Sequence, residues 1–228
     1  MLDVVIQTMP FLFEGFINTI VISLAAIAFG SGLGVILGLL RTLGGSYIKN
    51  IIGLYIHMIR ATPFLVQIYL VYFILPGVGW EVFDLSEFAA AVVALSIYTS
   101  SYTAEIVRSA LQAVPKGQWE AATAVGMNTF RKIYYVIAPQ AWKMTLPPLA
   151  GVYVLVIKGT SILSVIGVIE LMRTGEDSIY RYPSHIMLVL CMVAFMYFIY
   201  CYPILKLIKR MEIKLGRIEG ISEDGRDM

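Results

Sequence analysis

Long apolar runs recur along almost the whole chain, and this feature restricts most strongly what the chain can fold into. Five of them approach or exceed about 20 residues, the length at which a helix crosses the hydrocarbon core of a bilayer. Hydrophobic residues make up 59% of the sequence and charged residues only 14%, whereas soluble domains carry about 25% charged residues. The sequence therefore predicts an all-α integral membrane protein with one domain embedded in lipid.

The apolar runs predict about five transmembrane helices, with boundaries set by their flanking polar residues. Pro63 lies inside the second run, and Pro139, Pro147 and Pro148 lie near the start of the fourth, where we expect a bent or interfacial beginning. No basic segment precedes the first run and no small-residue cleavage site ends it, so we expect a retained helix rather than a signal peptide. The predicted spans cover residues 15–40, 51–75, 88–111, 138–168 and 186–208.

Positive charge is distributed unevenly over the segments between these runs. Fourteen of the 17 lysines and arginines fall in the first and third connections, at their edges, or in the C-terminal tail. The connection between the second and third runs carries Glu81, Asp84 and Glu87 and no basic residue. The positive-inside rule then predicts an outside N-terminus and a cytoplasmic C-terminus. The fourteen basic residues are Arg41, Lys49, Arg60, Arg108, Lys116, Arg131, Lys132, Lys143, Lys206, Lys209, Arg210, Lys214, Arg217 and Arg226.

Small residues in two spans have structural interpretations. Gly30, Gly34 and Gly38 form one stripe on the first predicted helix, and such stripes let helix backbones approach closely in lipid. Packing within one subunit and a dimer contact both stay open. Cys191 and Cys201 lie ten residues apart in the last run, a spacing that suits neither a metal site nor a disulfide, so we expect ordinary packing residues.

Several function classes have no motif in this chain. There is no GxxxxGK[ST] phosphate loop, no HExxH helix and no GxSxG nucleophile elbow, and the two histidines, His57 and His185, are isolated. No dense Asp/Glu/His relay crosses a predicted span, as a proton-coupled carrier would often need. The sequence therefore indicates a pore-forming or transport subunit whose energy comes from elsewhere.

The stretch WEAATAVGMNTFRKIYYVIAPQA, residues 119–141, lies between the third and fourth spans on the predicted cytoplasmic side. Its pattern predicts a short helix over 118–124 that ends at Gly126 in a left-handed conformation. Asn128 or Thr129 would cap a second helix that continues through Tyr135 and ends at Pro139. A small-residue helix of this kind either docks into a partner protein or lies on lipid headgroups, and the residues alone favour both equally.

The same stretch resembles the EAA loop of ABC importer permeases. Four further stretches resemble the polar amino-acid branch of that family: EGFINTIVISL (14–24), RATPFLVQIYLVYFILP (60–76), TAEIVRSALQAVPKGQWEAA (103–122) and KGTSILSVIGVIEL (158–171). The chain departs from the family at Ala61, where glycine is usual, and at Gly159, where many members have aspartate. The loop matches at Glu120, Ala121, Ala122, Gly126, Ile137, Pro139, Gln140 and Ala141.

This resemblance implies the permease subunit of an ATP-driven importer of polar amino acids in the bacterial cytoplasmic (inner) membrane. It implies a single transmembrane domain over 1–228 with a core at 14–210 and a cytoplasmic polar tail at 211–228. The implied partners are two ABC ATPase subunits, a second identical or homologous permease, and an extracytoplasmic amino-acid-binding protein or domain; no nucleic-acid partner is expected. This chain would not be an enzyme and would hold no cofactor, since ATP and Mg would bind to the ATPase. The implied ATPase-coupling residues are Trp119, Glu120, Ala121, Ala122, Thr123, Gly126 and Met127.

An autonomous channel or a secondary amino-acid carrier is the alternative. For either function, polar residues within the spans are candidates for the substrate path, because they are costly in lipid and tend to face a cavity. Lys158 suits a substrate carboxylate, although snorkelling toward the outer headgroups explains it slightly better. With Gly159 in place of an acid, we expect a neutral or acidic amino acid rather than arginine or lysine. The candidates are Gln67, Tyr98, Thr99, Ser100, Tyr102, Tyr153, Lys158, Thr160 and Ser161.

Overall fold

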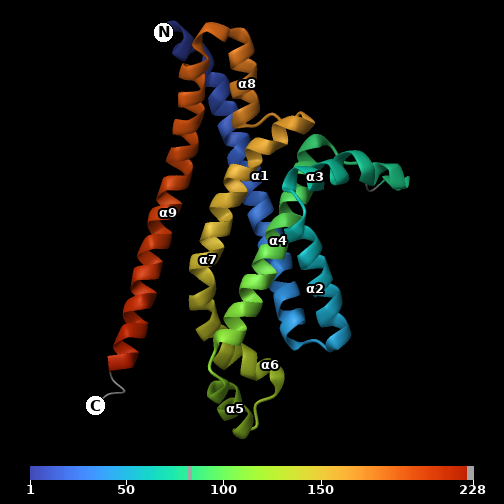
Figure 1. The fold of residues 1–228 in the computed structure, drawn as a ribbon, viewed down its shortest axis with the longest axis vertical. Coiled ribbons are helices and arrows are strands. Elements are labelled where there is room, and N and C mark those ends of the chain that lie inside the picture. Colours follow the sequence, from blue (N-terminus) through green and yellow to red (C-terminus); the bar gives the residue numbers. More distant parts are fainter. Residues whose placement is uncertain (82–83, 225–228) are drawn as a thin grey trace.

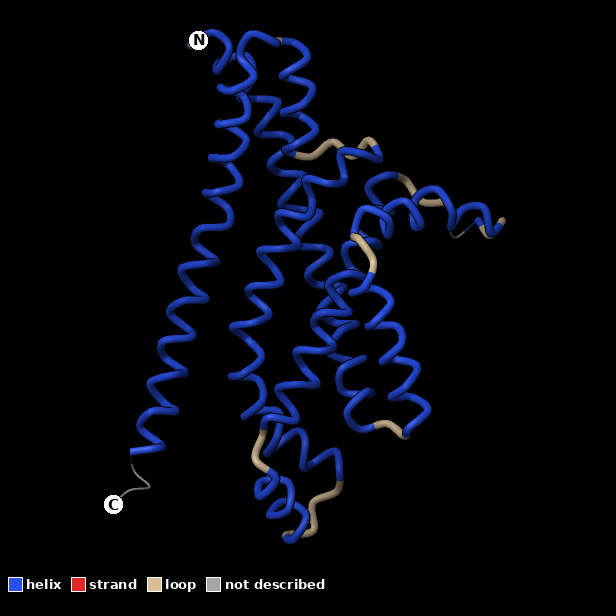
Figure 2. The backbone as a smooth tube through the Cα atoms, viewed as in Figure 1, coloured by secondary structure: helices blue, strands red, loops and turns tan. Residues whose placement is uncertain are grey.

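The computed structural model describes residues 1–81 and 84–224, with side chains described as far as Ile213. Helices joined by short connections account for most of this part of the chain, and it contains no strand (Figures 1 and 2). The expected all-α fold is therefore confirmed. The α-helices are α1 (Leu2–Leu43), α2 (Ser46–Ala61), α3 (Phe64–Tyr69), α4 (Glu87–Ala113), α5 (Lys116–Ala124), α6 (Thr129–Lys132), α7 (Ala138–Gly159), α8 (Leu171–Arg181) and α9 (Ile186–Asp224).

Four helical segments are long and apolar enough to cross a membrane: Leu2–Leu43, Glu87–Ala113, Thr129–Ile166 and Pro183–Ile213. A fifth crossing results if Ser46–Ala61 and Phe64–Val78 count as one span, although they are bent by 110°. The predicted number of about five spans thus agrees with the structure. The first and last helices extend beyond their predicted spans at 15–40 and 186–208.

The second predicted span is broken at Pro63. Thr62 and Pro63 both have extended backbone, as expected for a proline and the residue before it. The side chain of Gln67 closes the break, because its Nε2 donates to the carbonyl oxygens of Ile59 at 2.6 Å and Thr62 at 3.1 Å. Carbonyls at a helix end lack intrahelical partners, and that of Ile59 also accepts from Oγ1 of Thr62 at 3.4 Å. In Figure 1 the segment that begins with α3 extends away from the bundle.

The glycine stripe of α1 packs against α4 of the same chain. A Cβ atom on Gly34 would lie 2.5 Å from Cβ of Thr103, and one on Gly30 would lie 2.5 Å from Cβ of Thr99. Of the two interpretations of this stripe, the structure shows close packing within the subunit. The main hydrophobic core continues from this contact to α7 and includes Ile22, Ala26, Ala91, Leu95 and Val156. Of the two free cysteines, Cys201 is buried near Val154 and Ile157 and Cys191 is exposed.

The fourth span begins at Thr129 rather than at the predicted Ala138, and Pro139 does not end the preceding helix. A π-helical turn, Ile133–Ile137, joins α6 to α7, and the amide of Ala138 donates to the carbonyl of Ile133, five residues earlier. Proline removes the hydrogen bond that an α-helix would need at that point. The wider turn accommodates this loss and keeps the helix continuous.

Helix α8 was not anticipated from the sequence. It follows a 3₁₀ turn, Thr160–Ile166, and lies at the same end of the molecule as the N-terminus (Figure 1). Glu170 caps it, accepting hydrogen bonds from the amides of Met172 at 2.8 Å and Arg173 at 2.7 Å. The hydroxyl of Tyr197 in α9 donates to the same carboxyl group at 3.1 Å. Glu170 therefore joins α8 to α9 at this end of the bundle.

Candidate functional site

The segment from α5 to the start of α7 lies beyond the ends of α4 and α7, at the opposite end of the molecule from α8 (Figure 1). Val114 and Pro115 connect α4 directly to α5, and the π-helical turn connects α6 to α7. The segment is thus attached at both sides to a membrane span. We call residues 116–137 the coupling segment.

Helix α5 has one face against the spans and one face outward. Ala122 is buried, and Trp119 packs against the hydrophobic cluster that contains Val107, Leu111 and Ile137. Glu120, Ala121, Thr123 and Ala124 are exposed. Of the predicted coupling residues, Trp119 and Ala122 therefore attach the helix to the spans, and Glu120, Ala121 and Thr123 lie on its outward face.

Gly126 ends α5 as predicted. Its φ is +78°, and in the described residues positive φ angles occur only at glycine. The amide of Gly126 donates to the carbonyl of Thr123 at 2.9 Å, and the amide of Met127 donates to that of Ala122 at 3.1 Å. This pair of hydrogen bonds forms a Schellman motif, in which the left-handed residue favours glycine. Gly126 thereby fixes the direction in which the chain leaves α5.

Three polar contacts hold the remaining parts of the coupling segment together. Oδ1 of Asn128 accepts from the amide of Arg131 at 2.9 Å, which makes Asn128, and not Thr129, the cap of α6. Nζ of Lys132 donates to Oγ1 of Thr123 at 2.6 Å, and Nε2 of Gln140 donates to Oε1 of Gln118 at 3.2 Å. Both of these contacts join α5 to the helix that leads into the fourth span, so the segment is braced as one unit.

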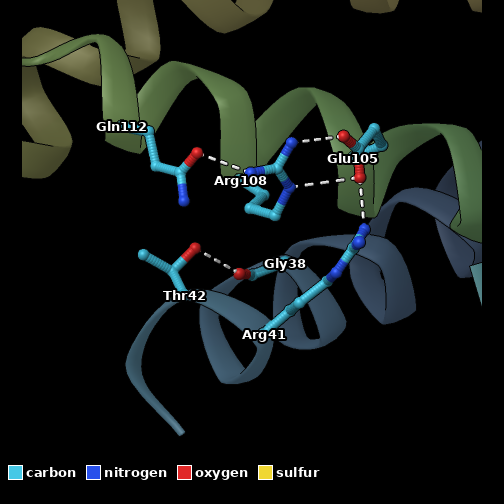
Figure 3. A network of polar contacts seen from close by, with 6 residues as sticks. All are labelled: Gly38, Arg41, Thr42, Glu105, Arg108 and Gln112. Carbon is cyan, nitrogen blue, oxygen red and sulfur yellow. Dashed lines mark hydrogen bonds and ion pairs between the residues drawn. The ribbon is translucent and has the colours of Figure 1, made fainter. Parts of the chain in front are cut away.

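A cluster of ionic contacts joins α1 to α4 near the coupling segment (Figure 3). The guanidinium groups of Arg41 from α1 and Arg108 from α4 both contact the carboxylate of Glu105, and Arg108 also donates to Gln112. The sequence places these residues at the ends of two spans but does not show that they meet. Because Arg41 and Arg108 both pair with the carboxylate of Glu105, this carboxylate is not available to pair with a third cation.

A cavity of about 240 Å³ lies between the α3, α4 and α7 helices, and it is the closest match to the predicted substrate path. Tyr98 and Lys158 both line it, beside Gly159. The rings of Phe64 and Tyr98 are 5.0 Å apart between centroids. Lys158 also lines a second cavity of about 400 Å³, together with Ser161. Three of the nine candidates for the substrate path, Tyr98, Lys158 and Ser161, therefore line one or both of these cavities.

The other six candidates contact neighbouring parts of the chain. Ser100 lies 2.7 Å from the hydroxyl of Tyr55, Tyr153 lies 3.0 Å from Ser31, and Thr160 lies 3.3 Å from Tyr197 between hydroxyl oxygens. Thr99 donates to the carbonyl of Leu95, Tyr102 lies under the guanidinium group of Arg60, and Gln67 closes the break before α3. In this structure Ser100, Tyr102, Tyr153 and Thr160 contact side chains of other helices, whereas the hydrogen bond of Thr99 stays within α4.

A family model supports the assignment that this geometry suggests. The model described as "Binding-protein-dependent transport system inner membrane component" matches residues 30–207. Those limits include α4, the whole coupling segment, both cavities and α8. The match therefore covers most of the chain, including every predicted site residue.

Curated relatives give a narrower assignment. The glutamine transport system permease protein GlnP of Escherichia coli (strain K12) is 39% identical over 170 residues, which cover 75% of this chain and 77% of that protein. The L-cystine transport system permease protein TcyB of Bacillus subtilis (strain 168) is 34% identical over 193 residues, which cover 85% of this chain and 81% of that protein.

Solved structures agree with these relatives. A chain from the crystal structure of an amino acid ABC transporter with histidines is 34% identical and has a TM-score of 0.81, with 92% of this chain and 96% of that chain covered. The MetNI methionine ABC transporter in an inward-facing conformation has a TM-score of 0.72 at 18% identity, which shows a shared fold. The chain therefore belongs to the family of inner-membrane components of binding-protein-dependent transport systems, within its branch of amino-acid ABC transporter permeases.

Proposed function

We propose that this chain forms the translocation path of an ATP-driven importer of polar amino acids by alternating access, and that cytoplasmic ATPase subunits drive it through residues 119–130. The observation that carries the proposal is the attachment of the coupling segment. Trp119 and Ala122 fix α5 to the spans, and Glu120, Ala121 and Thr123 are exposed on its other side. A partner that binds the exposed face therefore grips a segment that is rigidly joined to α4 and α7.

The position of the cavity supports a route by which movement of the coupling segment would change the shape of the proposed substrate site. The wall formed by Leu95 and Tyr98 belongs to α4, and the wall formed by Leu155 and Lys158 belongs to α7. Both helices continue into the coupling segment at their other ends. A displacement of α5 that changes the relative position of α4 and α7 therefore changes the cavity, as rigid-body switching between two states requires.

The proposed complex contains two ABC ATPase subunits that carry ATP and Mg, a second identical or homologous permease, and an extracytoplasmic amino-acid-binding protein or domain. The coupling segment and the C-terminus face the cytoplasm, and the N-terminus and α8 face outward. The uneven distribution of basic residues supports this orientation. The N-terminus and the described end of α9 lie at opposite ends of the molecule, which is consistent with this orientation (Figure 1).

The proposed substrate is a neutral or acidic polar amino acid such as glutamine, cystine or glutamate. Lys158 at the cavity offers a cation for a carboxylate, and none of the residues that line this cavity is acidic. Glu105, a carboxylate of α4 outside this cavity, is already shared by two arginines. A cationic side chain at membrane depth would therefore enter without a partner, which costs several kcal/mol.

Co-purification tests the proposal. The full chain, extracted from its own membrane, should bring down an ATPase subunit, and the reconstituted complex with its binding protein should take up glutamine, cystine or glutamate in an ATP-dependent manner. Transport by the chain alone, without ATP, would instead support an autonomous channel or secondary carrier. Uptake driven best by arginine and unaffected by excess glutamine or glutamate would contradict the substrate class.

A further inference from the structure

A groove of about 570 Å³ opens where α1, α4 and the coupling segment meet. Its walls come from three parts of the chain that are far apart in sequence: the end of α1, the end of α4, and the helix that runs from α6 into α7. Almost all of its lining is apolar, and it includes Leu39, Leu111, Phe130, Tyr134, Ala138 and Trp142. We call this space the apolar groove.

The aromatic side chains at the apolar groove are more than half exposed in the described part of the chain. Phe130 is 73% exposed, Tyr134 is 62% exposed and Trp142 is 55% exposed. The rings of Phe130 and Tyr134 are stacked at 5.9 Å with an interplanar angle of 8°, so they form a flat apolar wall. Tyrosine and tryptophan are enriched where a membrane protein meets the headgroup layer, which is the depth expected for the end of a span.

The charged residues on the helical wall of the apolar groove that runs from α6 into α7 are all basic. The helix that forms one wall carries Arg131, Lys132 and Lys143, and no acidic residue occurs between Glu120 and Glu170. Nζ of Lys132 donates to Thr123, whereas Arg131 and Lys143 are exposed and directly follow the lining residues Phe130 and Trp142. Basic residues next to apolar clefts between spans on the cytoplasmic side suit the headgroups of anionic lipids.

We propose that the apolar groove binds one acyl chain of an anionic phospholipid, whose phosphate contacts Arg131 at the end of the groove that lies in the coupling segment. This inference rests on the proposed cytoplasmic orientation of the coupling segment. Apolar walls match the acyl chain, and the surplus of cations matches the phosphate. A second copy of this chain fits less well, because it would bring the same surplus of positive charge to this face.

The bound lipid affects how the coupling segment is positioned relative to the spans. Its acyl chain touches α1 and α4 on one side and Phe130 and Tyr134 of the coupling segment on the other. A ligand that fills this space stabilises one position of the segment relative to the spans, because a ligand shifts an equilibrium by its differential affinity for the two states. The lipid is therefore part of the joint between the segment and the bundle.

Quenching of Trp142 fluorescence by brominated phospholipids tests the site directly. The chain has three tryptophans, so the variant Trp80→Phe, Trp119→Phe leaves Trp142 as the only reporter. The full chain is reconstituted in mixed phosphatidylglycerol and phosphatidylcholine vesicles in which one or the other lipid is brominated. We expect brominated phosphatidylglycerol to quench Trp142 at least twofold more than the same fraction of brominated phosphatidylcholine.

Three further variants identify the cause of this preference. Adding Arg131→Gln should bring the quenching ratio of the two lipids close to one, whereas Lys158→Gln, the same loss of a cation at the opposite end of the fourth span, should leave the preference intact. Ala138→Phe, which places a ring in the apolar groove, should reduce quenching by both lipids.

Two results would overturn the inference. Equal quenching by both lipids in the unmodified background would show that the site does not select anionic headgroups. Absence of quenching by either lipid would show that protein, such as a second copy, fills the apolar groove. Neither readout depends on transport, so failure here leaves the importer proposal intact, and failure to co-purify an ATPase leaves the fluorescence result unchanged.

Discussion

Single residues in this permease combine burial with charge in two contrasting ways. Glu105 is partly exposed and neutralised by Arg41 and Arg108, so its charge is balanced without full burial. Glu170 is fully buried and has hydrogen bonds but no cation within ion-pair distance among the described residues. Burial raises the pKa of the Glu170 carboxyl to about 7, although the amides of Met172 and Arg173 and the hydroxyl of Tyr197 oppose this shift.

Glu170 should make the stability of the protein depend on pH. Since the folded-state pKa of about 7 lies above the ordinary value of 4.5, the unfolded chain loses this proton first as pH rises. The contribution of Glu170 to stability is therefore fully present below about pH 4.5 and is lost as pH rises through 7, by at most about 1.4 kcal/mol for each pH unit.

Thermal unfolding of the purified protein between pH 5 and pH 8 measures this dependence. We expect the melting temperature to fall across that range in the wild type and to fall less in Glu170→Gln. Asp177→Asn on the exposed side of α8 is the matched control and should keep the wild-type slope. If Glu170→Gln keeps that slope as well, the buried carboxyl is not the titrating group.

At the scale of secondary-structure elements, the feature most important for coupling is α5, a short helix that lies between the α4 and α7 spans in the chain. The polar contacts of Lys132 with Thr123 and of Gln140 with Gln118 tie α5 to the helix that leads into α7. Gly126 sets the angle between them through its positive φ. We therefore expect a partner to recognise the geometry of this element and not only its exposed residues.

Replacement of Gly126 by aspartate should disrupt coupling while leaving the protein inserted. No atom lies within 4 Å of a Cβ placed on Gly126, so the cost is conformational, about 1–2 kcal/mol for a left-handed residue that carries a side chain. We expect Gly126→Asp to abolish ATPase docking and ATP-dependent uptake at normal membrane abundance.

Gly117→Asp is the matched control for that variant. Gly117 lies in the first turn of α5, also has no atom within 4 Å of an added Cβ, and does not have a positive φ. A carboxylate there is favourable for the helix N-terminus, so uptake should persist. Normal ATPase docking and normal uptake in Gly126→Asp would show that coupling does not require Gly126.

The sequence predicts some parts of this molecule well and misses others for physical reasons. The spans, the left-handed Gly126 and a helix cap at Asn128 or Thr129 follow from local composition and backbone preferences, and the structure selects Asn128. The continuous helix through Pro139 depends on a π-helical turn that no periodicity indicates. Likewise α8 is short and mostly polar, and its capping carboxyl is held by Tyr197 from a distant helix. The meeting of Arg41 with Glu105 is equally non-local, so only the packed structure shows that these side chains share charge.

The proposed orientation of the whole molecule can be tested by cysteine accessibility. In a background that lacks Cys191 and Cys201, a cysteine at position 84 should react with an impermeant reagent added outside cells. A cysteine at position 128 should react only after the membrane is opened. The reverse pattern would place the coupling segment outside and remove it from any cytoplasmic ATPase.

Site-specific photo-crosslinking tests the central claim most directly. Val125 at the tip of α5 is 72% exposed, and Val78 at the predicted outer side is 55% exposed, so both positions are available to a partner. With a photo-reactive residue at position 125 in native membranes, the account predicts a covalent product with an ABC ATPase subunit, and no such product from position 78. Recovery of lipid adducts alone from position 125, with no ATPase product, would contradict the account.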